Sequence, residues 1–205
     1  NIDWNVGRIL KKLDDLRLAN NTIVIYFSDN GPNGWRWNGG MKGRKGSIDE
    51  GGVRVPFLIR WPAKIKPGSR VEQVAGAIDL LPTLAEFASI PLISKKPLDG
   101  RSLQPLLFNN AKDWKDRYLF HFAGGRARKG KRTGSRVSVR NQRYRLDASG
   151  NLFDMVADPG QDRNVAADHS PAAKTMSFAA RQFLTELNGS LGPDDRPFPV
   201  GFTKS

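Results

Sequence analysis

The sequence contains no cysteine, which excludes disulfides, zinc–thiolate sites and cysteine nucleophiles from this chain. It has two histidines, His121 and His169, so a histidine-rich transition-metal site is not expected. No run approaches the roughly 20 apolar residues that a transmembrane helix requires, and residues 1–4 do not resemble a signal peptide. The 205 residues are otherwise typical of a globular protein, with 39% hydrophobic and 26% charged residues.

Acidic residues are also scarce, and the net charge is +13. Between Arg126 and Arg145 there are nine basic residues and no acidic one. This stretch is either a solvated hairpin or a contact surface for a polyanionic substrate such as a sulfated glycan. A nucleic-acid or polyanion-binding module is a further function class. It would interleave aromatic and basic residues, and Tyr144 is the only aromatic residue here, so we expect no nucleic-acid partner.

The first half of the chain has the pattern of an α/β protein. Apolar residues from Ile2 to Leu16 recur at helical spacing, and residues 22–27 form a β-branched and aromatic run. Such a run suits a strand covered on both faces, and a helix leading into it usually belongs to a parallel sheet. A second strand is predicted over Val53–Trp61, followed by a helix over Ala77–Ile90 with Asp79 as its N-cap.

The second half predicts short strands and one closing helix. The strands are expected at Arg117–Phe122, Ser135–Val139, Arg143–Leu146 and Asn151–Val156, and the helix at Ala172–Leu187. The predicted fold class is therefore α/β, followed by a small antiparallel sheet with one packed helix. The predicted boundaries are a main α/β domain over 1–111, a sheet-plus-helix subdomain over 112–190 and an extended tail over 191–205.

The segment "SDNGP" ends the first predicted strand abruptly. Ligands of open α/β sheets bind beyond the carboxyl ends of the strands, and Asp29 and Asn30 lie at that position. Carboxylate and carboxamide oxygens are hard ligands that suit Ca²⁺ or Mg²⁺. The alternative is a plain Asx turn, in which Asp29 only caps the backbone.

A glycine-rich loop follows and ends in "GRKGSIDEGGVRVP", residues 43–56. Its glycines allow the backbone to approach a ligand closely. Lys45 could then present a compact positive charge to an oxyanion. The alternative is a solvated lysine on a flexible loop. Trp35 and Trp37, in the same loop, could stack on a sugar ring or simply pack.

In this order, "SDNGP" and "KGSIDEGGVRVP" resemble the C-terminal half of the type I sulfatases, which have the alkaline-phosphatase-like fold. "AIDLLPTLAEFASI", "LDGRSLQPLL" and "VSVRNQRYRLDASGNLFDMVADPGQDRNVA" continue the similarity to about residue 167. The resemblance implies the C-terminal portion of an alkaline-phosphatase-like sandwich. It further implies that Asp29 and Asn30 bind calcium, with magnesium as the alternative, and that Lys45 is a catalytic and substrate-binding residue that contacts the sulfate.

The family's formylglycine motif, C/S-x-P-x-R, does not occur in the sequence. The resemblance thus implies a C-terminal part whose formylglycine nucleophile comes from an N-terminal half, and which is inactive alone. The expected function is hydrolysis of an aryl or carbohydrate sulfate ester, with a sulfated small molecule or glycan as partner. Phosphoester and phosphonate ester hydrolases of the same superfamily are the alternative. Family habit predicts an exported enzyme.

Overall fold

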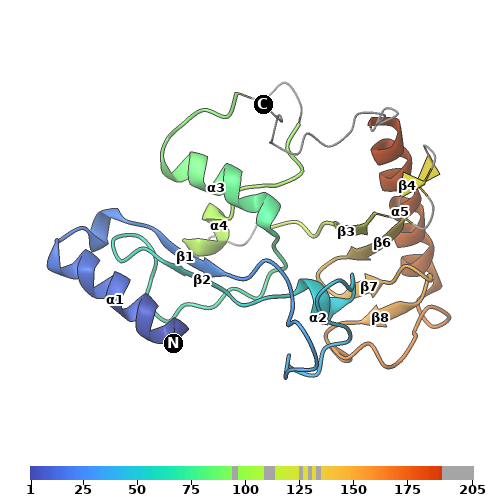
Figure 1. Cartoon of the computed structure of the whole chain (residues 1–205). Helices are drawn as coiled ribbons and strands as arrows, with labels where there is room; N and C mark the ends of the chain where they lie inside the picture. The colour runs from blue at the N-terminus through green and yellow to red at the C-terminus, as the bar shows by residue number, and fades with distance from the viewer. Residues whose placement is uncertain (94–96, 109–113, 125–126, 129–130, 133–134, 191–205) are drawn as a thin grey trace, which may run out of the picture. The chain divides into compact units, whose positions relative to one another are not determined.

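The computed structural model describes residues 1–93, 97–108, 114–124, 127–128, 131–132 and 135–190 (Figure 1). These residues form two compact units. The first consists of Asn1–Gly31 and Arg54–Leu119, and the second of Pro32–Val53 and the chain from Phe120 onward. The boundary predicted near residue 112 stays a prediction, and the predicted tail lies outside the described residues. No helix in the described part of the chain is long and apolar enough to cross a membrane.

The first unit joins short helices to a two-stranded sheet. Its elements are α1 (Ile2–Asp15), the 3₁₀ turn η1 (Ala19–Asn21), β1 (Val24–Phe27), β2 (Phe57–Arg60), η2 (Ala77–Asp79), α3 (Leu80–Phe87) and α4 (Gln104–Leu107). Elements α1, β1, β2 and α3 follow the sequence predictions in type and order, whereas the short helix α4 was not predicted. The strand predicted from Val53 begins only at Phe57, because Val53 ends a helical turn that starts at Glu50 and residues 54–56 are irregular.

Strand β1 is antiparallel to β2, with Val24 opposite Arg60 and Phe27 opposite Phe57. The prediction of a parallel sheet is therefore wrong for the pair that the structure describes. Coverage of β1 on both faces is also not observed, since Tyr26 and Phe27 are exposed and no residue of α1 is buried. The described chain supplies this strand with one partner, which leaves apolar surface on α1, β1 and β2 open.

Asp79 holds the start of α3 in a different way from the one predicted. It occupies the N-cap position, but its carboxylate accepts no capping hydrogen bond from the helix. The buried carboxylate instead accepts hydrogen bonds from the backbone N–H groups of Gly76 and Arg101, at 2.9 Å each, and pairs with Arg117. Arg101 and Arg117 come from segments 22 and 38 residues away, which the local capping pattern could not reveal.

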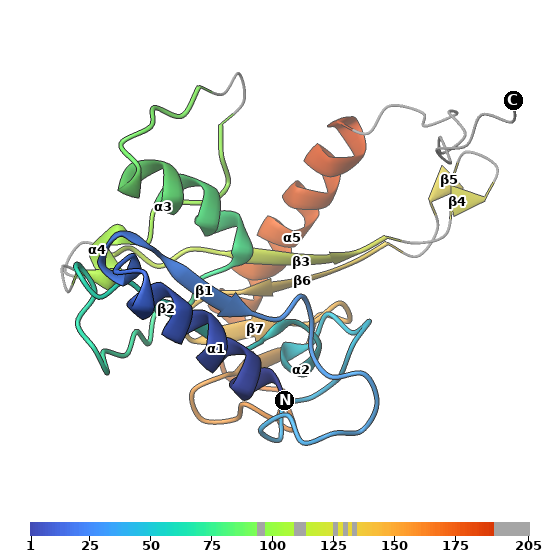
Figure 2. The same cartoon turned by 60° about the vertical axis from the view of Figure 1, so that its left-hand side comes forward.

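The second unit contains the antiparallel sheet and its helix. Its elements are α2 (Glu50–Val53), β3 (Leu119–Ala123), β4 (Ala127–Arg128), β5 (Lys131–Arg132), β6 (Arg136–Arg140), β7 (Tyr144–Leu146), β8 (Leu152–Asp154) and α5 (Ser170–Ser190). The main sheet has the strand order β3-β6-β7-β8, with β7 antiparallel to both neighbours. The prediction of a small antiparallel sheet with one packed helix is confirmed (Figure 2).

Apolar side chains of the sheet and of α5 form the core of this unit. Met176 of α5 is buried with Val139, Leu146 and Leu152 of the sheet. The rings of Phe120 and Phe183 stack at 4.5 Å between centroids. These contacts hold the sheet against α5.

The basic stretch is only partly described. Strands β4 and β5 pair in antiparallel orientation, with Ala127 opposite Arg132. Arg126 and Lys129 lie outside the described residues. The hairpin and the polyanion-contact hypotheses for this stretch therefore both stay predictions.

Candidate active site

The turn after β1 leaves an acidic side chain open. Ser28 Oγ donates to the carbonyl oxygen of Asn30 at 3.2 Å, and Asn30 Nδ2 donates to the carbonyl oxygen of Gly31 at 2.8 Å. The Asp29 carboxylate is exposed and has no hydrogen-bond or ion-pair partner among the described residues. An Asx turn capped by Asp29 is thus not the arrangement that forms here.

Both side chains fit a hard cation in their chemistry. The bond from Asn30 Nδ2 to the backbone orients this amide, which keeps its oxygen as an acceptor, and the Asp29 carboxylate supplies negative charge. Calcium takes six to eight oxygen ligands. No group of three or more histidine or acidic residues able to hold a metal ion occurs within the described residues. Asp29 and Asn30 would therefore supply part of a cation site.

Lys45 lies in a tight turn of the second unit. The backbone N–H of Ser47 donates to the carbonyl oxygen of Arg44 at 2.8 Å, and the N–H of Lys45 donates to that of Pro32 at 3.1 Å. Gly46 has a φ of +87°, a conformation that side-chain-bearing residues rarely adopt. The Lys45 side chain is exposed and has no ion-pair partner among the described residues. Its charge is available to a ligand while its backbone is held in place.

Two glycines allow the helical turn α2 to pack against the Lys45 turn. A Cβ atom on Gly52 would lie 2.2 Å from the carbonyl oxygen of Ser47, and one on Gly51 would lie 2.6 Å from that of Gly43. Such approaches are far inside van der Waals contact. The pair Gly51-Gly52 is therefore required by close packing within this loop.

A buried ion-pair cluster attaches the loop to the sheet. Glu50 Oε2 accepts hydrogen bonds from Arg145 Nη2 at 2.7 Å and Arg145 Nε at 3.0 Å, and Arg140 Nε lies 3.4 Å away. The side chains of Glu50 and Arg145 are 5% and 1% exposed. Two arginines from β6 and β7 thus share one carboxylate from the loop.

The backbone next to Glu50 is anchored by the same strands. Arg145 Nη1 and Ser138 Oγ both donate to the carbonyl oxygen of Ile48, at 2.9 and 2.7 Å. On the other side, the N–H of Glu50 donates to Gln161 Oε1 at 2.9 Å. Hydrogen bonds therefore hold the segment 48–50 against the sheet and Gln161. This anchored segment starts three residues after Lys45.

Sequence reasoning missed the buried cluster, although the strand β6 carried a signal. In "VSVR" the apolar residues Val137 and Val139 alternate with Ser138 and Arg140, which are also buried. A strand with polar side chains on a covered face requires buried partners. The alternating pattern of β6 does not show which residue is the partner, because Glu50 lies ninety or more residues away from Arg140 and Arg145.

His121 lies near this cluster. Burial, and then the positive charge of Arg145, lower the pKa of His121 from 6.5 to about 4. Its Nδ1 atom is buried without a hydrogen-bond partner among the described residues. The folded protein therefore holds this imidazole neutral at neutral pH.

This shift predicts a pH-dependent stability. The folded state binds fewer protons at His121 than the unfolded state between pH 6.5 and about 4, so stability falls as the pH drops through that window. The loss is at most about 3 kcal/mol. Urea unfolding at several pH values should show this slope, and His121→Asn should flatten it. A variant that keeps the wild-type slope would contradict the assignment.

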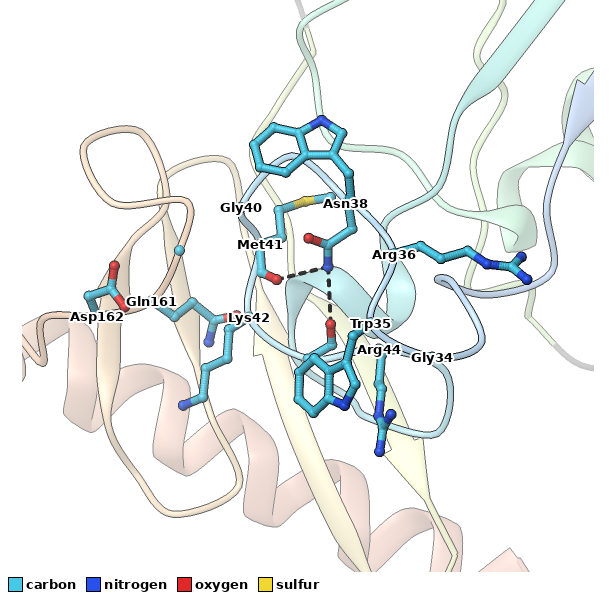
Figure 3. A pocket seen from close by; sticks show the side chains of 13 residues that line it. Gly34, Trp35, Arg36, Asn38, Gly40, Met41, Lys42, Arg44, Gln161 and Asp162 are labelled. Carbon is cyan, nitrogen blue, oxygen red and sulfur yellow. Dashed lines mark hydrogen bonds between the residues drawn. The ribbon is translucent and has the colours of Figure 1, made fainter.

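A hollow of about 740 Å³ lies beside the Lys45 turn (Figure 3). The loop segment 34–44 and residues 160–162, from the turn after β8, line it. Asn38 Nδ2 shapes the loop by donating to the carbonyl oxygens of Met41 and Gly43, at 2.9 and 3.1 Å. Figure 3 shows the indole of Trp35 beside the guanidinium of Arg44, which lies 4.4 Å from the ring centroid.

The three predicted site residues thus divide between the units. Asp29 and Asn30 adjoin each other in the first unit, and Lys45 belongs to the second. Each is presented by irregular backbone at the end or start of regular structure, as the sequence predicted. Their assigned roles stay predictions.

Comparison with known proteins supports the resemblance. The sulfatase family profile matches residues 1–90. The chain is 43% identical to the steryl-sulfatase of Rattus norvegicus over 131 residues, which is 59% of this chain and 23% of that protein. It is 34% identical to a sulfatase of Formosa agariphila, covering 88% of this chain and 36% of that protein. For the N-acetylgalactosamine-6-O-sulfatase of Bacteroides thetaiotaomicron the identity is 31%, with 86% and 39% covered.

Solved structures share the fold. The crystal structure of Ps i-CgsB in complex with k-i-k-neocarrahexaose has a TM-score of 0.77 and 28% identity, covering 89% of this chain and 40% of that one. The phosphonate monoester hydrolase of Silicibacter pomeroyi has a TM-score of 0.65 and 26% identity, with 93% and 39% covered. The chain therefore has the fold of part of an alkaline-phosphatase-like hydrolase. The chain belongs to the sulfatase family, and it corresponds to a C-terminal-like portion spanning about a quarter to two fifths of these relatives.

Proposed function

We propose that this chain is part of an enzyme that hydrolyses sulfate esters. The observation that carries the proposal is Lys45, an unpaired ammonium group held on a constrained turn in a chain of the sulfatase family. Sulfate ester cleavage builds negative charge on the leaving and equatorial oxygens. Fixed positive charge stabilises that state more than the ground state.

The three candidate residues would have two different roles, cation binding and sulfate binding. Asp29 and Asn30 would hold calcium, with magnesium as the alternative, and that ion would neutralise charge on the sulfate oxygens. Lys45 binds the sulfate and stabilises the leaving oxygen through its own charge. The backbone bonds around residues 44–52 fix the turn from which the Lys45 side chain extends.

We further propose that the nucleophile, a formylglycine, comes from an N-terminal half of the same enzyme. Exposed apolar side chains on α1, β1 and β2 support this proposal. Each of these elements presents one to solvent, namely Trp4, Phe27 and Leu58. Large exposed apolar patches mark contact sites for other protein segments. On this view residues 1–205 alone have no sulfatase activity, and the complete enzyme is exported.

A carbohydrate sulfate is the preferred substrate class over an aryl or steryl sulfate. The steryl-sulfatase of Rattus norvegicus matches 59% of this chain, whereas the N-acetylgalactosamine-6-O-sulfatase matches 86%. The match to a carbohydrate sulfatase therefore extends over a larger share of the chain. Hydrolysis of phosphonate or phosphate esters is the second candidate, favoured by the likeness to the phosphonate monoester hydrolase.

Substrate comparison with the complete enzyme tests this function. The purified enzyme should hydrolyse an aryl sulfate and sulfated oligosaccharides with higher kcat/KM than the corresponding phosphate and phosphonate monoesters. Residues 1–205 alone should hydrolyse none of them. A preference for the phosphonate ester would replace the sulfatase proposal with the second candidate.

The cation assignment predicts a weaker metal site in Asp29→Asn. Removing one ligand charge should raise the calcium concentration for half-maximal activity by roughly tenfold to 100-fold, with activity restored by excess calcium. Isothermal titration of the metal-free enzyme with calcium should show the same loss of affinity. The matched variant Asp99→Asn, at an exposed acid of the same unit, should leave both unchanged. Unaltered calcium affinity in Asp29→Asn would refute the assignment.

A further inference from the structure

The loop before Lys45 presents two large aromatic side chains to solvent. Trp35 and Trp37 are 87% and 88% exposed. Tryptophan is highly buried in most proteins, so two open indoles two residues apart need a reason. Trp37 has no ring or cation contact among the described residues, which leaves both of its faces open.

Trp35 is oriented by its neighbour. The guanidinium of Arg44 lies over its ring at 4.4 Å from the centroid, so one face is occupied by a cation and the other is available (Figure 3). The hydrogen bonds from Asn38 Nδ2 to the carbonyl oxygens of Met41 and Gly43 hold the loop between Trp35 and Arg44 in place. The aromatic surface is therefore mounted on a structured loop beside the hollow.

The opposite wall of the hollow contains a constrained amide. Gln161 is 4% exposed and has a φ of +58°, which costs a non-glycine residue on the order of 1 kcal/mol. The bond from the Glu50 N–H to Gln161 Oε1 sets the orientation of the side chain. Its Nε2 group is buried and has no hydrogen-bond partner among the described residues. A ligand hydroxyl or a bridging water would satisfy this donor.

The hollow is also positively charged. Its lining includes Arg36, Lys42 and Arg44 against a single acid, Asp162. Its volume of about 740 Å³ lies in the ordinary range for small-molecule sites. Open indoles, one free amide donor and cations together suit a ring that is apolar on its face, hydroxylated at its edge and anionic. A steroid would leave the cations and the amide unpaired.

We infer that this hollow binds a non-reacting, anionic sugar ring of the substrate, with Trp37 stacking on the sugar face. The inference rests on the proposed function, and it adds a second contact point to the sulfate site. Arg44 lines the hollow and Lys45 follows it directly in the turn. A sugar bound here would therefore lie next to Lys45, the residue proposed to contact the reacting sulfate group.

The test compares long and short substrates in the complete enzyme. Trp37→Ala should raise KM for sulfated oligosaccharides about tenfold, equivalent to about 1.4 kcal/mol. Both kcat for the oligosaccharides and kcat/KM for an aryl sulfate should stay at wild-type values. Trp37→Phe should recover most of the affinity because it keeps an aromatic face. The matched variant Phe178→Ala, at a 55% exposed aromatic residue of α5, should change none of these values.

Direct binding separates this inference from the proposed function. Isothermal titration with a panel of sulfated galactosaminoglycan, glucosaminoglycan and galactan tetrasaccharides measures affinity without turnover. Weaker binding to Trp37→Ala supports the subsite even if no sulfate is released. Equal losses on the aryl sulfate and the oligosaccharide, or a lowered Tm, would show that Trp37 packs against another segment of the enzyme and overturn the inference. Wild-type failure to bind any tetrasaccharide, or unchanged binding by the variant, would overturn it as well.

Discussion

Replacing Lys45 with alanine is expected to lower kcat/KM for sulfate esters by about 100-fold to 1000-fold, the usual cost of removing one preorganised group that stabilises transition-state charge. The side chain is exposed and unpaired in the described chain, so its loss removes no internal contact. Thermal unfolding of Lys45→Ala should therefore match wild type. Steady-state kinetics on an aryl sulfate, with Tm measured in parallel, checks both expectations.

The division between kcat and KM identifies the role of this lysine. A loss mainly in kcat indicates stabilisation of the leaving oxygen, and a loss mainly in KM indicates ground-state binding of the sulfate. Lys45→Arg keeps the charge but changes its geometry, and it should restore only part of the activity. Lys174→Ala removes an exposed lysine from α5 and serves as the charge-matched control. If Lys45→Ala retained activity like Lys174→Ala, the catalytic role of Lys45 would be excluded.

Breaking the buried cluster at Glu50 is expected to destabilise the protein by about 3–5 kcal/mol, because Glu50→Ala leaves the arginines without a counter-charge inside the protein. Arg145 is 1% exposed and cannot reach water without local unfolding. The same change frees residues 48–50 from the sheet, so the Lys45 turn should also lose its fixed position. We expect a drop in kcat/KM to accompany the drop in stability.

A double-mutant cycle measures the coupling. The losses in Glu50→Ala and Arg145→Ala should not add in the double variant, since either change alone already removes the pair. The exposed pair Lys11–Asp15, with side chains 75% and 51% exposed, is the matched control. Asp15→Ala should change the unfolding free energy by less than about 1 kcal/mol in urea denaturation. A Glu50→Ala variant as stable as Asp15→Ala would show that the cluster does not anchor the loop.

Local patterns predicted the longer helices and most strands of both units, but not the short helices α2 and α4. The spacing of Ile2, Val6 and Ile9 predicts a helix, and α1 forms there. Alternation in "RVSVR" predicts a strand, and β6 forms there. These predictions succeed because helix and strand periodicities are properties of neighbouring residues. The parallel pairing of β1 failed for the same reason, since the choice of a partner strand is not a local property.

The candidate site residues were also accessible from the sequence. Asp29 and Asn30 are adjacent, and Lys45 lies within a short glycine-rich segment, so their order along the chain carried the sulfatase resemblance. The capping role predicted for Asp79 failed, because Gly76, Arg101 and Arg117 compete for its carboxylate. The N-cap preference for aspartate predicts the position of Asp79 at the start of the helix, but it does not predict the partners of its carboxylate.

By itself, then, the sequence determined the family, the fold class, the absence of cysteine chemistry and the identity of Asp29, Asn30 and Lys45 as candidates. Only the tertiary structure decided that Glu50 pairs with Arg145, 95 residues away, and that the turn at Gln161 faces the loop of Trp35 and Trp37 across a hollow. The chemical nature of each side chain, and its position along the chain, can be read directly from the sequence. Burial, charge pairing and cavity shape depend on which distant segments the folded chain brings into contact.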